Sequence, residues 1–292
     1  MSPLKAAASE STSQARLAAT ARMWAAKHRD DLAAQAIEKA LLIAPDDPDL
    51  LAQAVRIQLR LGDARKAQAL LARLKVVAPG DVTTLQTEDE FRALTNGREE
   101  LAAIRLLART GRAQEAAQRL LAMFPHGAPR GALGAEYYRI VAGVPEKRVT
   151  ALDELRRRTQ QDPSDTEAAL ALADLLNQRS QTRREANRIV WSLALRDDMD
   201  RTVVMNHWRR VLQAAGADPA YAESFRAYLR MAPGDSEFEQ KLAENNAAIE
   251  ARKELERDPG YIAQQQGLRA LSRGDLTAAD TLLSRAVQVR GT

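Results

Sequence analysis

Small and large apolar residues recur along most of the chain with the three- and four-residue spacing of one helix face. Near the start, Leu17, Ala21 and Trp24 share such a face, and the windows that follow are filled mainly by Ala, Leu, Arg, Gln and Glu. These residues are strong helix formers. No window shows the period-two alternation of β-branched residues that strands require. The pattern predicts an all-α chain.

Prolines that end helical stretches recur at a fixed spacing. Pro45 and Pro79 are 34 residues apart, and each follows a helical stretch and precedes an aspartate within two residues. Proline cannot continue a helix, so each one ends the second helix of a pair. A period of 34 residues is the length of a tetratricopeptide repeat (TPR), a unit of two antiparallel helices.

The apolar positions fall into register with this period. Small residues let two antiparallel helices approach each other, and large ones fill the groove between them. The expected core positions of the first two units, about 14–47 and 48–81, are Leu17, Ala21, Trp24, Ala33, Ile37, Ala40, Leu51, Val55, Ala67, Leu71 and Leu74.

Turn residues repeat as well. Glycine opens the turn between two helices at Gly62-Asp63, at Gly111 and at Gly274-Asp275, and Pro163 and Pro233 close two further units. The sequence therefore predicts a TPR-type α-solenoid, a right-handed superhelix of six or seven antiparallel helix pairs. A helical bundle without repeats is the alternative.

Two segments do not fit the pairing. Residues 82–95 form an insertion long enough for one extra helix, and the charged stretch 234–259 reads as an unpaired linker helix and a possible hinge. The expected organisation has a disordered segment, a TPR array of about six pairs, this linker and a last pair, at residues 1–13, 14–233, 234–259 and 260–292.

Composition excludes several functional classes. The chain has no cysteine, so disulfides, zinc–thiolate sites and cysteine nucleophiles are absent, and only 4% of its 292 residues are aromatic. The formal net charge of +4 is far from the dense basic patch of a nucleic-acid-binding protein. No apolar run has the length of a membrane span, so we expect no membrane insertion.

Nothing in the sequence points to catalysis. The three histidines, His28, His126 and His207, are not in a metal-binding spacing, and no glycine-rich phosphate-binding motif occurs. Carboxylate runs such as 88–90 are expected at helix ends or on exposed faces. A two-carboxylate glycosidase would need more aromatic residues to hold sugar rings. We therefore expect no catalytic residues, no cofactor and no metal.

One arginine pattern goes beyond packing. Positions nine and thirteen of the units that begin at 14, 48 and 97 face the concave groove in TPR geometry, and they carry the candidate partner-binding residues Arg22, Arg56, Arg60, Arg105 and Arg109. Guanidinium groups in a row can bind carboxylates bidentately. The alternative is that arginine is common here and these side chains are simply solvated.

Several stretches also resemble a known family. They are similar to the N-terminal periplasmic repeats of the family formed by the C component of bacterial cellulose synthase, in the family's order over residues 15–290. The matching stretches are Pro45-Asp-Asp-Pro48, Leu59-Arg-Leu-Gly-Asp63, Asn96-Gly-Arg98, Ala108-Arg-Thr-Gly-Arg-Ala-Gln-Glu-Ala116, Glu136-Tyr-Tyr138, Ile140-Val-Ala-Gly-Val-Pro145, Leu152-Asp-Glu-Leu155 and Gln266-Gly-Leu-Arg-Ala270.

The resemblance implies a periplasmic scaffold of a cellulose synthesis and export system, from a parent protein anchored in the outer membrane. Its groove would bind protein partners of the cellulose synthase complex, or the glucan chain or peptidoglycan. The scarcity of aromatic residues favours a protein partner. The alternative from the residues alone is a cytosolic TPR adaptor that binds an acidic peptide or protein.

Overall fold

The computed structural model describes the backbone of residues 3–216 and 218–290 and the side chains of residues 12–216 and 218–289. The described residues form helices and connecting turns, with no strand among them. Within these residues, no helix is both long enough and apolar enough to cross a membrane. The all-α prediction is confirmed.

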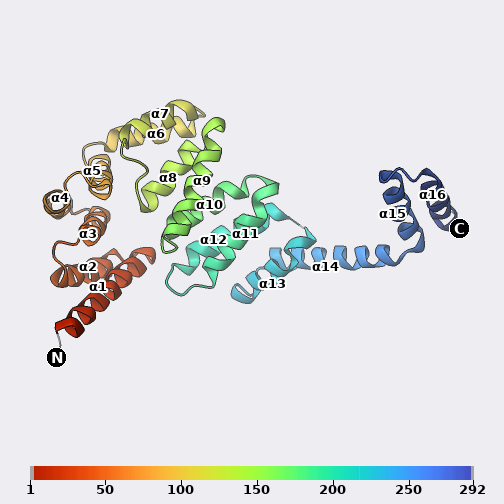
Figure 1. Cartoon of the computed structure of the whole chain (residues 1–292), viewed down its shortest axis with the longest axis horizontal. Coiled ribbons are helices and arrows are strands. Elements are labelled where there is room, and N and C mark those ends of the chain that lie inside the picture. Colours follow the sequence, from red (N-terminus) through yellow and green to blue (C-terminus); the bar gives the residue numbers. More distant parts are fainter. Residues whose placement is uncertain (1–2, 217, 291–292) are drawn as a thin grey trace. The chain divides into compact units, whose positions relative to one another are not determined.

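The chain divides into two compact parts, unit 1 (Met1–Val211) and unit 2 (Leu212–Thr292), and the division falls within helix α12. Figure 1 shows the helices of each unit in chain order. The helices of unit 1 are α1 (Pro3–Ala26), α2 (Asp30–Ile43), α3 (Pro48–Leu61), α4 (Ala64–Val77), α5 (Val82–Leu94), α6 (Arg98–Arg109), α7 (Ala113–Met123), α8 (Gly131–Val141), α9 (Pro145–Gln161), α10 (Thr166–Asn177), α11 (Ser180–Ala194) and α12 (Arg201–Ala215).

Successive helices of unit 1 pack as neighbours in the manner of a TPR-like solenoid. α1 packs on α2, α3 on α4, α6 on α7 and α10 on α11, and α2 packs in turn on α3. The core positions expected in the first two units are buried, except that Leu17 and Trp24 are partly buried against the first cluster. The extra helix α5 packs on α3 and α4.

The recurring turn residues have a local cause. Gly62, Gly111 and Gly274 all have positive φ, between 79° and 83°, which glycine adopts without a steric penalty. The aspartates after Gly62 and Gly274 cap the next helix, because Asp63 accepts from the backbone N–H of Lys66 and Asp275 from that of Ala278. Asp47, which follows Pro45, caps α3 in the same way. A proline or glycine followed by an aspartate therefore marks the end of one helix and the start of the next.

The start of the chain differs from expectation. The sequence predicts disorder over 1–13, but α1 already begins at Pro3. Alanine is the strongest helix former, and Ala6-Ala7-Ala8 lies directly ahead of the packed part of this helix, so the helix continues toward the N-terminus. Residues 1–2 lie outside the described residues.

Unit 2 contains a 3₁₀ turn, η1 (Pro219–Tyr221), and the helices α13 (Ala222–Met231), α14 (Ser236–Arg257), α15 (Pro259–Ser272) and α16 (Leu276–Arg290). The expectation of an unpaired helix over 234–259 needs correction, because α14 packs on α13. Phe238 is fully buried there, with its ring centroid 5.2 Å from that of Phe225. The sequence pattern missed this pairing because a single aromatic residue supplies most of it.

Candidate functional site

Unit 1 contains an open cavity of about 1020 Å³. Its lining comes from α1, α3, α5, the loop between α7 and α8, the helices α8, α9, α10 and α12, and the segment before α12. Seven arginines and six carboxylates line it, whereas Tyr138 is its one phenylalanine, tyrosine or tryptophan residue within the described part of the chain. The cavity therefore offers many hydrogen-bonding groups, little aromatic surface and almost balanced charge.

The structure separates the five candidate partner-binding arginines of the sequence analysis, here called the arginine ladder. Arg22, Arg56 and Arg60 line the cavity, whereas Arg105 and Arg109 do not. Only part of the ladder therefore shares one binding surface.

Three of these arginines are held by carboxylates of the chain itself. Arg56 Nε lies 2.6 Å from Glu90 Oε2, and its Nη2 donates to Thr87 Oγ1 at 3.0 Å. Arg60 Nη2 lies 2.7 Å from Asp30 Oδ1. A partner carboxylate would have to compete with these internal partners.

Arg105 forms the most regular of these pairs. Its Nε and Nη2 donate to the two oxygens of Glu136 at 2.6 and 2.7 Å, so the contact is bidentate. The hydrogen bond with Glu136 raises the pKa of the Arg105 guanidinium above its ordinary value. Arg105 on α6 is thus tied to α8, the first helix of the following pair.

The same arrangement recurs further along unit 1. Arg139 on α8 pairs with Asp174 on α10, and Arg156 on α9 pairs with Glu185 on α11. Each pair joins residues about one repeat apart in sequence, 35 and 29 positions respectively. Several arginines of unit 1 therefore tie neighbouring helix pairs together. Two of them, Arg56 and Arg105, are residues that the sequence pattern suggested as partner-binding groups.

Two members of the ladder remain available. Arg22 and Arg109 are exposed, and neither forms an ion pair among the described side chains. Arg22 alone of the two faces the cavity. It is the ladder residue best placed to bind a partner.

The acidic run at 88–90 was expected on an exposed face, and this expectation is wrong for two of its members. The side chains of Asp89 and Glu90 are 1% and 3% exposed. Burial of a carboxylate is costly unless hydrogen bonds and opposite charges compensate it. Glu90 receives these from Arg56 and from the backbone N–H of Arg130, at 2.8 Å.

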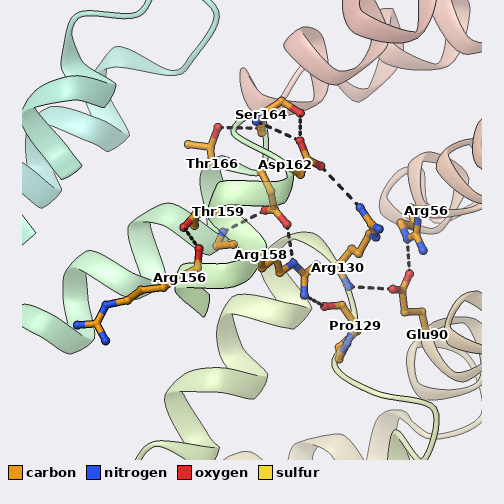
Figure 2. A network of polar contacts seen from close by, with 12 residues as sticks. Arg56, Glu90, Pro129, Arg130, Arg156, Arg158, Thr159, Asp162, Ser164 and Thr166 are labelled. Carbon is orange, nitrogen blue, oxygen red and sulfur yellow. Dashed lines mark hydrogen bonds and ion pairs between the residues drawn. The ribbon is translucent and has the colours of Figure 1, made fainter. Parts of the chain in front are cut away.

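These two carboxylates fix the loop between α7 and α8, and Figure 2 shows the contact of Glu90 with Arg130. Asp89 accepts from the backbone N–H of His126 and lies 3.0 Å from its Nδ1, while Glu90 holds Arg130 further along the loop. The loop is seven residues long and contains two prolines. Within it the N–H of Gly127 donates to the carbonyl oxygen of Phe124, whereas the N–H groups of His126 and Arg130 donate to side chains of α5. α5 serves as its support.

The far side of the same loop is held by α9 and the turn after it, as Figure 2 shows. Arg158 Nη1 donates to the carbonyl oxygen of Pro129 at 2.7 Å, and its Nε donates to Asp165 at 2.9 Å. The side chain of Arg130 lies 3.6 Å from Asp162. The network therefore joins α3, α5, the loop, α9 and the start of α10 around the cavity wall.

Two of the three histidines lie beside carboxylates of the chain: His126 beside Asp89, and His207 beside Asp174. His207 Nδ1 lies 2.8 Å from Asp174, and His28 is exposed in the turn between α1 and α2. Burial alone would raise the pKa of Asp174. The hydrogen bond with His207 and the charges of Arg210 and Arg139 outweigh this, so its pKa lies below the ordinary value. No group of metal-binding side chains occurs within the described residues.

Comparison with known proteins gives a consistent result. No protein-family model matches the chain. It is 30% identical over 293 aligned residues to the cellulose synthase operon protein C of Salmonella typhimurium, which covers 99% of this chain and 24% of that protein. It is 32% identical to the protein of the same name from Xanthomonas axonopodis pv. citri, over 98% of this chain and 19% of that protein.

A solved structure is also similar. It is described as the flexible tandem repeat domain of the C component of bacterial cellulose synthase, with 27% identity and a TM-score of 0.55. The match covers 82% of this chain and 97% of that domain. The chain thus spans about a quarter of the length of its curated relatives, and the resemblance noted in the sequence is confirmed.

Proposed function

We propose that this chain, a relative of cellulose synthase operon protein C over nearly its whole length, is a non-catalytic periplasmic TPR scaffold of a bacterial cellulose synthesis and export system. The similarity to the repeat domain of the C component of cellulose synthase is the observation that supports it most. The scaffold would bind partner proteins of the synthase complex and support passage of the glucan to an outer-membrane pore.

The chemistry of the cavity favours a polypeptide as its occupant. Sugar rings are commonly held by stacking on aromatic faces, and Tyr138 is the one tyrosine, phenylalanine or tryptophan among the lining residues that the structure describes. A polypeptide instead offers amide groups and side chains of both charges. These match a wall in which seven arginines stand beside six carboxylates.

The alternative, a cytosolic adaptor for acidic tails, receives less support. Such an adaptor needs several arginines that are free to bind carboxylates. Arg56, Arg60 and Arg105 already bind Glu90, Asp30 and Glu136 within the chain. A dense acidic peptide would have to displace these partners.

The test is direct binding of the other purified proteins of a cellulose synthase complex to this chain, measured by calorimetry. We expect one of them to bind, and we expect Arg22→Glu to weaken its affinity roughly tenfold, the effect of losing about one charge-assisted hydrogen bond. Cells that carry the variant should export less cellulose.

Arg65→Glu is the matched control, because Arg65 is exposed on α4 and does not line the cavity. It should leave the affinity unchanged. If none of these proteins binds the parent chain, the scaffold proposal is wrong. Equal weakening by both variants would show that binding depends on net charge and not on the cavity.

A further inference from the structure

A second group of basic side chains lies outside the cavity lining, where the start of α9 meets the turn between α10 and α11. We call it the basic surface, and its members are Lys147, Arg148, Arg179, Arg183 and Arg184. Arg148 Nη1 donates to Gln178 Oε1 at 2.8 Å, and Arg183 Nε donates to Asn177 Oδ1 at 3.2 Å. The end of α10 therefore brings the starts of α9 and α11 together.

The basic surface differs from the rest of unit 1 in its lack of carboxylate partners. None of its five side chains forms an ion pair among the described side chains. Glu185, the one acid of α11, is bound by Arg156, and Asp174 of α10 is bound by Arg139. The first turn of α9 contains one acid, Glu146, and that of α11 contains none. Most of the positive charge is thus not neutralised within the chain.

Part of this charge has a structural use at the end of α10. Arg148 Nη2 donates to the carbonyl oxygen of Leu175 at 2.6 Å, and Arg183 Nη2 lies 3.5 Å from that of Asn177. Cations are favourable at the C-terminal end of a helix, but that end carries only about half an elementary charge. The other three members are exposed, apart from one another's neighbourhood, and their side chains form no hydrogen bond among the described residues. Helix capping therefore explains two of the five cations.

The backbone at this surface adds further positive character. The N–H groups at a helix start attract anions and repel cations. α9 and α11 both begin here, and neither has a side-chain cap. Arg179 occupies the N-cap position of α11, whereas at the start of α10 the side chain of Asp165 accepts from the backbone N–H of Ala168. The basic surface thus combines cationic side chains with two helix starts that lack an acceptor.

Arg148 is held in a costly environment. Burial lowers the pKa of its guanidinium, and the charge of Arg179 lowers it further. Its Nε is buried and has no hydrogen-bond partner in the chain. A bound anion would reduce the repulsion between neighbouring guanidinium groups. The surface is therefore arranged to receive negative charge from outside the chain.

Two features indicate what kind of anion fits. Four of the five cations are arginines, whose planar guanidinium groups bind carboxylates bidentately. Val149 follows Arg148 directly and is 67% exposed, so an apolar side chain borders the charged groups. A polypeptide that carries acidic and apolar residues can use both features, whereas a simple inorganic anion can use only the first.

We propose that the basic surface is a docking site for an acidic polypeptide segment of a partner protein. Carboxylates of the segment bind the guanidinium groups, and an apolar side chain of the segment covers Val149. The site is separate from the cavity and from the arginine ladder. The proposal therefore holds or fails independently of what the cavity binds.

The test uses the full chain and a fluorescent peptide of alternating glutamate and leucine as the probe, with fluorescence anisotropy as the readout. We expect binding that weakens as salt is added. The double variant Arg179→Glu/Arg184→Glu should weaken it roughly tenfold or more, the effect of losing charge-assisted hydrogen bonds. Both side chains are exposed and make no printed contact, so circular dichroism should show an unchanged helical fold.

The matched control is Arg65→Glu/Arg109→Glu, which changes the net charge equally at two exposed arginines outside the cavity lining and outside the basic surface. It should change the affinity less than about twofold, and Arg22→Glu in the cavity should also have little effect. Equal weakening by the two double variants, or weakening by Arg22→Glu alone, overturns the proposal. Tighter binding of phosphatidylglycerol vesicles than of the peptide, lost in Arg179→Glu/Arg184→Glu, would overturn it in favour of a membrane surface.

Discussion

Both units are built from antiparallel helix pairs, but their charged side chains form different kinds of ion pair. In unit 1, charged side chains tie one pair to the next, as Arg105 does with Glu136 and Arg156 with Glu185. In α14 of unit 2, charged side chains pair along their own helix, as in Arg252–Glu256 and Lys241–Glu237. A contact of the first kind holds neighbouring pairs together, whereas the second stabilises only the helix that carries it.

The two units also differ in their balance of basic and acidic residues. Residues 1–211 contain 33 lysines and arginines against 27 acids, and residues 212–292 contain 10 against 12. Several arginines of unit 1 neutralise carboxylates of a neighbouring repeat, among them Arg105, Arg139 and Arg156. A solenoid depends on contacts between neighbours alone, so unit 1 should be the more rigid of the two.

The largest expected effect comes from breaking a buried tie in unit 1. Arg56→Glu would place a second carboxylate beside Glu90, whose side chain is 3% exposed. Breaking a buried ion pair costs about 3–5 kcal/mol. Urea unfolding followed by circular dichroism should show this loss.

The matched variant in unit 2 is Arg252→Glu. Its partner Glu256 lies on the same exposed helix face, where solvent screens the pair, so the loss of stability should be far smaller than for Arg56→Glu. Similar losses for the two variants would show that ties between repeats do not distinguish the units.

A glycine in each unit gives the next comparison. A Cβ added at Gly134 would lie 2.2 Å from the backbone oxygen of Pro129, whereas one at Gly267 would meet the side chain of Leu283 at 2.7 Å. Backbone that is hydrogen-bonded to Arg158 cannot retreat, but a leucine side chain can rotate. Gly134→Ala should therefore cost about 3 kcal/mol or more and Gly267→Ala about 1 kcal/mol, by thermal unfolding.

Much of the fold could be predicted from the sequence. The period of 34 residues, the glycine turns and positions such as Ile37 and Leu74 follow from local sterics, and these residues are buried as expected. A repeat also fixes which helices are neighbours. The helix pairs could therefore be read from one chain with no knowledge of the tertiary structure.

The site was harder to predict because burial of charge depends on tertiary partners. The sequence places Arg56 and Arg105 on the concave surface. It does not show that Glu90 and Glu136 reach them from later helices. Asp89 lies in an acidic run that reads as solvated. The reason for its burial is a tertiary contact: Asp89 accepts a hydrogen bond from the backbone of His126 in the loop between α7 and α8.

Acidification should act more strongly on unit 1. The hydrogen bond from Arg156 lowers the pKa of Glu185, and the pKa of Asp174 is lowered as well. A carboxylate whose pKa is lower in the folded state contributes stability above its unfolded pKa, about 4, and loses it as pH falls below that value. The free energy of unfolding should decline from about pH 4 downward.

Glu185→Gln provides the control for this pH dependence, because an amide cannot titrate. The variant should be less stable than the parent at pH 7, and the difference should shrink as the pH falls below about 4. A difference that is constant over this range would show that the Arg156 pair does not contribute to the acid sensitivity.

The smallest effect is expected within unit 2 and concerns motion rather than stability. The first turns of α14 are anchored by Phe238, whose ring contacts Phe225 and Tyr228, and Arg226 donates to Asn246 at 2.7 Å. Beyond that point residues 250–257 are exposed. We predict that this second half of α14 acts as a hinge for the last pair, α15 and α16.

Spin labels at Glu223→Cys on α13 and Arg269→Cys on α15 span the exposed half of α14, and both positions are exposed. Their distance distribution should be broad, because few contacts restrain this segment. A second pair at Glu223→Cys and Glu239→Cys spans only the Phe238 contact and should give a narrow distribution. If both pairs are equally narrow, α14 is a rigid rod and its exposed half only sets the direction of the last pair.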